Sequence, residues 1–338
     1  MQVEAAFAAA LAVFRPATPF AVAVSGGPDS TALMRLAAPL RPLVLTVDHG
    51  LRPDSADEAA RVAGWAAELG LQHRTLPWRE AKPARGIQAA ARAARYRLLA
   101  EACAAAGLAG LMTGHTLDDQ IETVAMRRSK GSGDAGAAGI PAQAELPDAP
   151  VRLMRPLIAV SKAALVTWLE AGGHPFLVDP SNADPRFERA RLRAAGAAAD
   201  CAEVAAWQRA RVAVERDAVA ALEGAAVSEG AVLAERARLT ALTAPALDAA
   251  LGALLRRAGG RDHPGTRAER NRLAAAITAP GTFPGRTLAG ALIRPGRRAE
   301  GGPERIAFLP EAGGRLRRDR FWLPFGHFPQ IAADGSVL

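Results

Sequence analysis

The chain has 338 residues, of which 50% are hydrophobic, and a formal net charge of +8. This length suits two or three domains with a sizeable core, and without a run of 18 apolar residues no membrane span is expected. The only cysteines, Cys103 and Cys201, stand apart in alanine-rich stretches, which argues against a disulfide framework or a cysteine metal site. We expect a cytoplasmic protein, since the first residues lack the basic segment and cleavage site of a signal peptide.

The positive charge is unevenly distributed along the chain. Residues 1–185 carry 18 Lys and Arg against 18 Asp and Glu, whereas residues 186–338 carry 24 against 16. A neutral module followed by a basic one suggests a polyanionic partner such as nucleic acid. Ala and Arg are abundant throughout, however, so a compositional bias of the genome explains the charge equally well.

Short apolar segments alternate with helical patterns over the first 130 residues. The sequence predicts buried strands at 20–24, 43–47, 73–76 and 111–113, and helices at 31–38, 54–69, 86–106 and 117–128. Such alternation predicts βαβ units and a parallel sheet. Ligands of these sheets bind at the carboxyl ends of the strands, so residues that follow a strand are functional candidates.

The rest of the chain is predicted to be mainly helical. The composition of residues 130–150 predicts a loop. Residues 161–171 are predicted to form a helix capped by Ser161. Helical patterns continue to about residue 290, after which Gly, Pro and Arg dominate. The expected fold is therefore α/β, with a parallel-sheet, Rossmann-like domain at 1–190, a mainly helical domain at 191–290 and a short tail at 291–338 without an assigned structure.

The most specific motif, Ser25-Gly26-Gly27-Pro28-Asp29-Ser30, joins the first expected strand to the first expected helix. A glycine-rich turn before a helix presents backbone N–H groups and partial positive charge to a phosphate. The serine hydroxyls add donors, and Asp29 is placed to hold a Mg²⁺ ion that bridges phosphates. Neither the Walker A nor the dinucleotide-binding spacing is present. A turn that binds nothing is the plainer alternative, which the strand–turn–helix context disfavours.

Two further candidates are less specific. Asp48 and His49 follow the second expected strand, where a nucleotide contact and a simple turn are equally good interpretations. Arg92 and Arg95 share one face of the next long helix and suit phosphate binding. Taken alone, a solvated basic helix face explains these two arginines better.

An acidic pair follows the fourth expected strand. His115 precedes a helix on which Asp119 and Glu122 are three residues apart, so both carboxylates share a face. Paired carboxylates suit a metal ion or an ammonium group. A solvated helix start with acidic residues in its first turn is the alternative interpretation.

In this order and spacing, the motifs resemble those of the bacterial tRNA(Ile)-lysidine synthases, which are PP-loop enzymes of the N-type ATP pyrophosphatase superfamily. The resemblance covers about residues 18–195 and includes the turn Asp179 to Asp184 and the arginine-rich segment after it. It implies ATP-dependent ligation of lysine to C2 of the wobble cytidine of tRNA(Ile) with a CAU anticodon. The reaction passes through an adenylated tRNA and releases pyrophosphate and AMP. ATP and Mg²⁺ are the implied cofactors, and free lysine and this tRNA are the implied partners. Whether the protein forms a homodimer stays open.

The resemblance also implies roles for individual residues. The ATP phosphates would bind to Ser25, Gly26, Gly27, Pro28, Asp29 and Ser30, with Mg²⁺ near Asp29 and with Asp48 and His49 beside the nucleotide. Arg95 and His115 would join Asp29 in catalysis, and Asp119 and Glu122 would recognise lysine. RNA or phosphate contacts fall to Arg189, Arg191 and Arg193. Ala190 stands where the family usually has asparagine, so any contact from that amide is lost.

Two other functions stay open. A tRNA 2-thiolation enzyme of the same superfamily would typically carry paired active-site cysteines, which the isolated Cys103 and Cys201 do not provide. A nucleotide-responsive RNA-binding protein without catalysis is the other alternative, and the intact Asp29, Asp119 and Glu122 argue against it.

Overall fold

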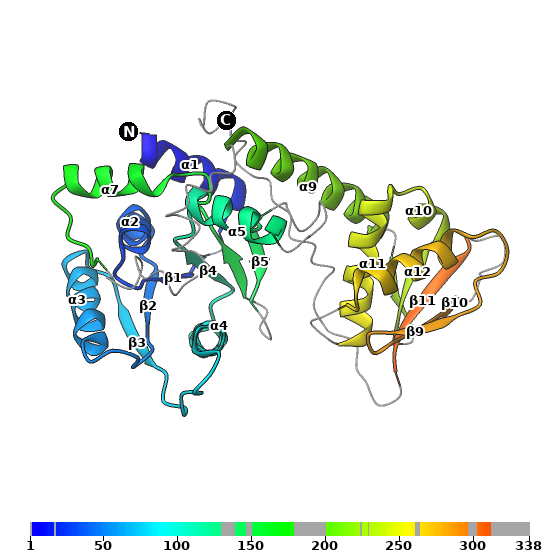
Figure 1. Ribbon diagram of the computed structural model, residues 1–338, viewed down its shortest axis with the longest axis horizontal. Helices are drawn as coiled ribbons and strands as arrows, with labels where there is room; N and C mark the ends of the chain where they lie inside the picture. The colour runs from blue at the N-terminus through cyan, green and yellow to red at the C-terminus, as the bar shows by residue number, and fades with distance from the viewer. Residues whose placement is uncertain are drawn as a thin grey trace. The chain divides into compact units, whose positions relative to one another are not determined.

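The computed structural model describes residues 2–16, 18–129, 139–146, 151–178, 201–223, 225–228, 230–260, 264–296 and 303–311. The chain divides into two compact units within helix α9 (Cys201–Leu222). The first unit contains a mostly parallel sheet and the second an antiparallel one (Figure 1). Among the helices of these ranges, none combines the length and apolar character needed to cross a bilayer.

The first unit is built on a six-stranded sheet with the order β3-β2-β1-β4-β6-β5. Its strands are β1 (Ala21–Ala23), β2 (Leu43–Asp48), β3 (His73–Pro77), β4 (Gly110–Thr113), β5 (Gln143–Glu145) and β6 (Arg152–Met154). All neighbours run parallel except the edge strand β5, which pairs antiparallel with β6. The strand order reverses direction between β1 and β4, and ligands bind at such switch points in α/β sheets.

Helices cover both faces of this sheet. They are α1 (Gln2–Phe14), α2 (Pro28–Ala37), α3 (Ser55–Glu68), α4 (Ile87–Ala105), α5 (Leu117–Ser129) and α7 (Lys162–Ala171), with a short 3₁₀ turn at Ala38–Leu40. Successive strand residues point to opposite faces. Val22 and Val44 accordingly join a core that contains residues of α1, α2, α3 and α7, whereas Leu45 and Leu111 join a core that contains α4 residues.

The predicted α/β class and the predicted strands and helices of residues 20–130 are confirmed, and the bounds agree within a few residues. Ser161 caps α7 as expected, because its hydroxyl accepts a hydrogen bond from Ala164 N at 3.2 Å. One detail is wrong: β3 is not a buried strand. Three of its five residues are exposed, since β3 is the last strand at its edge of the sheet.

The second unit combines helices with a five-stranded antiparallel sheet, in the order β7-β8-β11-β10-β9. Its strands are β7 (Ala226–Ser228), β8 (Ala231–Glu235), β9 (Arg286–Leu288), β10 (Ala291–Pro295) and β11 (Arg305–Pro310), and its helices include α10 (Arg236–Thr240), α11 (Ala244–Gly259) and α12 (Arg267–Thr278). The prediction of a mainly helical domain did not include this sheet. Two of its strands, β10 and β11, lie within the segment expected to be a tail. The expected boundaries at 190 and 290 stay predictions.

A buried arginine ties the start of α10 to the end of α12. Arg236 is 9% exposed, and its guanidinium donates to Ile277 O at 2.8 Å, to Gly281 O at 2.6 Å and to Ala279 O. The same group pairs with Glu304 Oε1 at 2.8 Å. Carbonyls at a helix C-terminus lack partners within the helix, so this one side chain satisfies groups that burial would otherwise leave unpaired.

We expect Arg236→Met to lower the free energy of unfolding of the second unit by about 3 kcal/mol, because several carbonyls and Glu304 lose their donor. The matched control is Arg238→Met, since Arg238 forms an exposed ion pair with Glu235 at 3.0 Å, and such pairs contribute about 0.5 kcal/mol. Amide hydrogen exchange of α12 in the full chain measures both effects. Equal protection of α12 in the two variants would contradict the role given to Arg236.

Candidate functional site

The turn of residues 25–30 connects β1 to α2 and is shaped by its glycines. Gly26 has a φ of +86°, which favours glycine, and a Cβ there would lie 2.5 Å from Leu177 Cδ1. The Gly26 carbonyl accepts hydrogen bonds from Leu177 N at 2.8 Å and from Thr31 Oγ1 at 3.0 Å. Gly27 is the N-cap of α2, and Pro28 opens the helix with a φ suited to that position.

The two serines of the turn have different surroundings. Ser30 is buried, and its hydroxyl accepts from Ser25 N at 3.1 Å and donates to Gly27 O at 3.1 Å, so it holds the turn in shape. Ser25 is exposed, with its Oγ 3.3 Å from Ser30 Oγ. The amides of Asp29 and Ser30 lie in the first turn of α2, where N–H groups have no partner within the helix. An anion at this helix start would find these donors together with the Ser25 hydroxyl.

Asp29 meets a lysine from a distant part of the chain. Its Oδ2 accepts a hydrogen bond from Lys162 Nζ at 3.1 Å, whereas its Oδ1 is buried and has no hydrogen-bond partner among the described residues. Burial raises the pKa of Asp29, the Lys162 charge opposes that rise, and the charges of Asp119 and Asp118 add to it. Asp118 also fixes the backbone of Lys162, because its Oδ2 accepts from Lys162 N at 2.7 Å. Several carboxylates and one ammonium group therefore converge beside the helix start.

The sequence interpretation gave Lys162 no role, although it lies in the same cluster as Asp29. It is the first residue of α7 and stands 133 positions after Asp29. One signal was available: this chain has only three lysines, and a cation at a helix N-terminus opposes the helix dipole. A residue that is unfavourable for its own helix is worth testing for a long-range partner.

The turn between β4 and α5 lies directly against the start of α2. A Cβ on Gly114 would lie 2.8 Å from the carbonyl carbon and oxygen of Asp29 and 2.9 Å from Ser30 N. Because these are backbone atoms, no side-chain movement could relieve the overlap. Glycine at 114 therefore allows the two turns to pack together, which brings the start of α5 beside the turn of residues 25–30.

The start of α5 carries the predicted acidic pair. Asp119 Oδ2 accepts from Thr116 N at 2.9 Å and from Thr116 Oγ1 at 3.2 Å, so Asp119 also caps its helix. Glu122 is only 6% exposed, which does not fit the alternative of a solvated helix start. His115 precedes the helix, and its Nδ1 lies 2.9 Å from the Thr113 hydroxyl at the end of β4.

A second group of candidates gathers at the carboxyl end of β2. Asp48 Oδ1 accepts from Gly50 N at 2.9 Å and stabilises the turn after the strand. The His49 ring packs edge-on against Trp78 at a centroid distance of 6.1 Å, and its buried Nδ1 has no partner among the described residues. Burial and the nearby charge of Arg95 lower the pKa of His49, with Asp48 opposing them. His49 is therefore neutral near pH 7, and Arg95 lies close to it.

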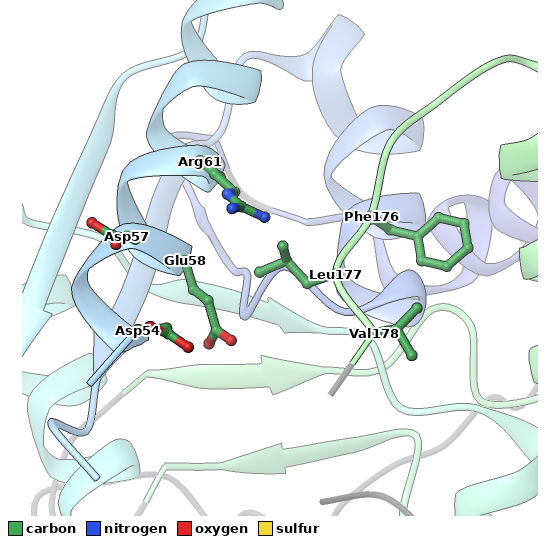
Figure 2. Close-up of a pocket in the computed structure, with 7 residues that line it drawn as sticks. All are labelled: Asp54, Asp57, Glu58, Arg61, Phe176, Leu177 and Val178. Carbon is green, nitrogen blue, oxygen red and sulfur yellow. The ribbon is translucent and has the colours of Figure 1, made fainter. Parts of the chain in front are cut away.

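A hollow of about 410 Å³ opens beside the turn of residues 25–30. Its lining residues come from α3 and from the segment after α7: Asp54, Asp57, Glu58, Arg61, Phe176, Leu177 and Val178. Figure 2 shows Leu177 pointing towards α3, whereas Phe176 and Val178 point away from it. The hollow borders the turn because Leu177 packs on Gly26. These lining residues were not predicted as functional.

The structure thus places the residues of the turn, Asp119 and Lys162 in one cluster, and His49 and Arg95 in a second. β1 and β2 are neighbours, with Val24 N donating to Leu45 O at 2.9 Å, so both clusters lie at the same edge of the sheet. In the part of the chain that the structure describes, no three His, Cys, Asp or Glu side chains form a metal cage. The predicted RNA residues Arg189, Arg191 and Arg193 lie outside the described residues, as does the turn at 179–184.

Known proteins give an independent view of the chain. It is 56% identical over 176 residues to a tRNA(Ile)-lysidine synthase of Methylobacterium sp. strain 4-46, a match that covers 51% of each chain. It is 50% identical over 240 residues to that of Methylobacterium nodulans, covering 70% of this chain and 64% of the relative. A third relative with this name, from Rhodopseudomonas palustris, is 53% identical over 188 residues. The match covers 53% of this chain and 54% of the relative. The chain thus spans between 51% and 64% of the length of these curated relatives.

The family assignment rests on a longer match. The profile of the PP-loop domain family matches residues 1–196, which is more than half of the chain and includes every candidate residue described above. A PP-loop domain implies ATP binding, in agreement with a helix start, a glycine-rich turn and an acidic residue arranged as in a phosphate site. The chain therefore belongs to the PP-loop family.

Proposed function

We propose that this chain ligates lysine to C2 of the wobble cytidine of tRNA(Ile) with a CAU anticodon, at the expense of ATP. The observation that carries the proposal is the convergence of the phosphate-type turn of residues 25–30 with Asp29, Asp119 and Lys162. The 50–56% identity to relatives named tRNA(Ile)-lysidine synthase supports the same reaction. AMP and pyrophosphate would be the by-products, and the cytoplasm, where ATP, lysine and tRNA meet, would be the compartment.

ATP would bind with its phosphates at the start of α2. The amides of Asp29 and Ser30 and the Ser25 hydroxyl would donate to phosphate oxygens, and Asp48 and His49 would lie beside the nucleotide. Mg²⁺ fits the site because Asp29 Oδ1 is buried without a partner among the described residues, and Mg²⁺ is often bound by one carboxylate plus substrate phosphates. When bound, Mg²⁺ would neutralise charge on the departing pyrophosphate.

Lysine would be held by Asp119 and Glu122. Thr116 fixes the Asp119 carboxylate, and Glu122 projects from the same face of α5 one turn later. Free lysine has two amino groups, so one can be held as an ammonium ion while the other, uncharged, attacks C2 of the activated cytidine. Fixing the amine in this way lowers the entropic part of the barrier.

The tRNA would present an unstacked wobble base, as chemistry on a base requires. We assign His115 and Arg95 to the reaction centre with Asp29. His115 is anchored at the end of β4 through Thr113, and Arg95 lies near His49. Arg189, Arg191 and Arg193 stay predicted RNA contacts, and a homodimer stays a prediction.

The 2-thiolation alternative receives no support from Cys103. Its side chain is fully buried, and burial raises the pKa of the thiol to about 11, so it would not form a thiolate at neutral pH. A sulfur-transferring enzyme needs a reactive, accessible thiolate. The non-catalytic alternative would leave the convergence of Asp29, Asp119 and the buried Glu122 without a purpose.

The proposal predicts transfer of lysine to RNA. We expect radiolabelled lysine to enter unmodified tRNA(Ile) in the presence of ATP and Mg²⁺, and to require cytidine at the wobble position. A tRNA with uridine at that position is the matched control. RNA-dependent pyrophosphate release without bound label would keep the adenylation chemistry and refute lysine as the nucleophile.

Asp29→Asn should abolish the Mg²⁺-dependent part of ATP binding, because the amide keeps the shape of the side chain but loses its charge. Pyrophosphate release should fall about 100-fold or more, since metal neutralisation of the leaving group contributes several kcal/mol. Calorimetric titration with ATP, with and without Mg²⁺, measures the binding directly. Asp57→Asn on exposed α3 is the control. A Mg²⁺ response that persists in Asp29→Asn would remove Asp29 from the metal site.

Asp119→Asn should raise the KM for lysine by about 10- to 100-fold, because a charge-assisted hydrogen bond to an ammonium contributes about 1.5–3 kcal/mol. The affinity for ATP should not change. Asparagine can still accept the hydrogen bond from Thr116 N, so the cap of α5 is kept. Thr116→Val, which loses the hydroxyl donor but leaves the Asp119 charge, is the control. If ATP affinity collapses in Asp119→Asn, the acidic pair serves the nucleotide instead.

A further inference from the structure

The connection between β3 and α4 and the first half of α4 carry an unusual concentration of positive charge. Residues 78–97 contain six Arg and Lys but a single acid, Glu80, although residues 1–185 as a whole are balanced. Five of these six cations are exposed. One of the five, Arg97, pairs with acidic residues, and the other four are Arg79, Lys82, Arg85 and Arg92. We call them the 79–92 surface. The connection is the cyan segment at the foot of the first unit in Figure 1.

The described residues do not neutralise the charge of this surface by ion pairing. Glu80 pairs with Arg97, and Arg97 also donates to Glu101 at 2.9 Å, so the one nearby acid is engaged elsewhere. Across the described residues, no carboxylate forms an ion pair with the four cations of the 79–92 surface. Four exposed cations without counter-charges create a positive potential that an external anion can use.

Two of the four cations lie over aromatic rings. Lys82 Nζ is 4.1 Å from the centroid of the Trp78 ring and donates to Glu80 O at 3.1 Å. The guanidinium carbon of Arg92 is 5.0 Å from the centroid of the Tyr96 ring. Both rings are buried, so they offer no face to a base and instead hold the two cations in place through cation–π contacts. Cations held at fixed positions along a surface suit the phosphates of a nucleic-acid backbone.

This surface is continuous with the functional site. Trp78 N donates to Asp48 O at 2.8 Å, and the Trp78 ring meets His49 edge-on. The charges of Arg95 and Lys82 both reach His49, where they lower its pKa together with burial. β3 is one of the two edge strands of the sheet, and no other strand of the described residues pairs with its outer side. A polymer whose end or loop enters the site can therefore lie across the 79–92 surface.

We propose that the 79–92 surface binds the single-stranded RNA that flanks the reacting base. Arg79, Lys82 and Arg85 recur every third residue and would contact phosphates of neighbouring nucleotides, independently of sequence. This inference rests on the proposed function, because it takes the RNA to be the substrate. It places an RNA contact before residue 185, whereas the charge distribution of the sequence pointed to the residues after it.

The test is a triple substitution in the full chain, Arg79→Gln, Lys82→Gln and Arg85→Gln. Fluorescence anisotropy with unmodified tRNA(Ile) and with its isolated anticodon stem-loop should show an affinity at least about tenfold lower. The slope of log K against log salt should fall by about 2, because three phosphate contacts to a single strand are lost. The affinity for ATP, measured by calorimetry, should not change, since none of the three residues belongs to the turn of residues 25–30.

The control removes the same number of positive charges from the other end of the strands, where their amino ends lie. Arg15 and Arg41 precede β1 and β2, Arg74 lies near the start of β3, and all three are exposed. Their replacement by Gln should leave the affinity and salt slope of RNA binding close to those of the natural protein. An equal loss of RNA affinity in both triple variants would mean that only net charge matters. That result would overturn the role proposed for the 79–92 surface.

The outcomes separate this inference from the proposed function. If the natural protein incorporates lysine and the Arg79, Lys82 and Arg85 triple variant binds RNA normally, only the role proposed for the 79–92 surface is overturned. RNA binding that depends on the surface, without lysine incorporation, supports the surface and overturns the reaction. A fall in ATP affinity would mean that these cations serve the nucleotide and would overturn the inference. A natural protein that binds no RNA overturns both.

Discussion

The site depends on an electrostatic conflict that only cations can resolve. Asp29 stands at the helix start that offers its amides to an anion, and the charges of Asp118 and Asp119 reach the same carboxylate. Phosphate would thus enter a region that already carries negative charge. In the structure, Lys162 neutralises part of it through a contact of 3.1 Å. In the proposed reaction Mg²⁺ adds to that neutralisation, so metal binding and nucleotide binding are coupled by charge and not only by shared ligands.

Two glycines make this convergence sterically possible. Gly26 lets Leu177 pack on the turn after β1, and Gly114 lets the turn after β4 lie against the backbone of Asp29. A methyl group at either position would meet atoms closer than ordinary contact allows. Three segments far apart in the sequence are therefore packed turn against turn at the switch point of the sheet. Such packing limits the freedom of the site, and it keeps Asp29 and Asp119 within reach of each other's charge.

The sequence predicted well what short-range patterns determine. The turn of residues 25–30, strands β1, β2 and β4 and helices α2 to α5 are each bounded by glycine, proline or a polar cap, so their limits could be read directly. Lys162 was missed because its role depends on a contact across 133 residues. The second sheet was missed although its strands are as short as those of the first, because they do not alternate with helices along the sequence as β1 to β4 do. The acidic pair was predicted from helical spacing, but the burial of Glu122 comes from tertiary packing.

Net charge proved a poor guide to where charge is available. Several arginines of the basic second unit are engaged internally: Arg236 in helix capping, Arg270 in two hydrogen bonds with Asp248 at 2.7 and 2.9 Å, and Arg211 with the buried Glu215 at 2.7 Å. Each of these cations counts in the composition but contributes little to the external potential. Residues 1–185 show the converse, because their balanced total includes the four cations of the 79–92 surface. Surface potential follows from which charges pair with each other, and pairing is a property of the fold that a sum over the sequence does not contain.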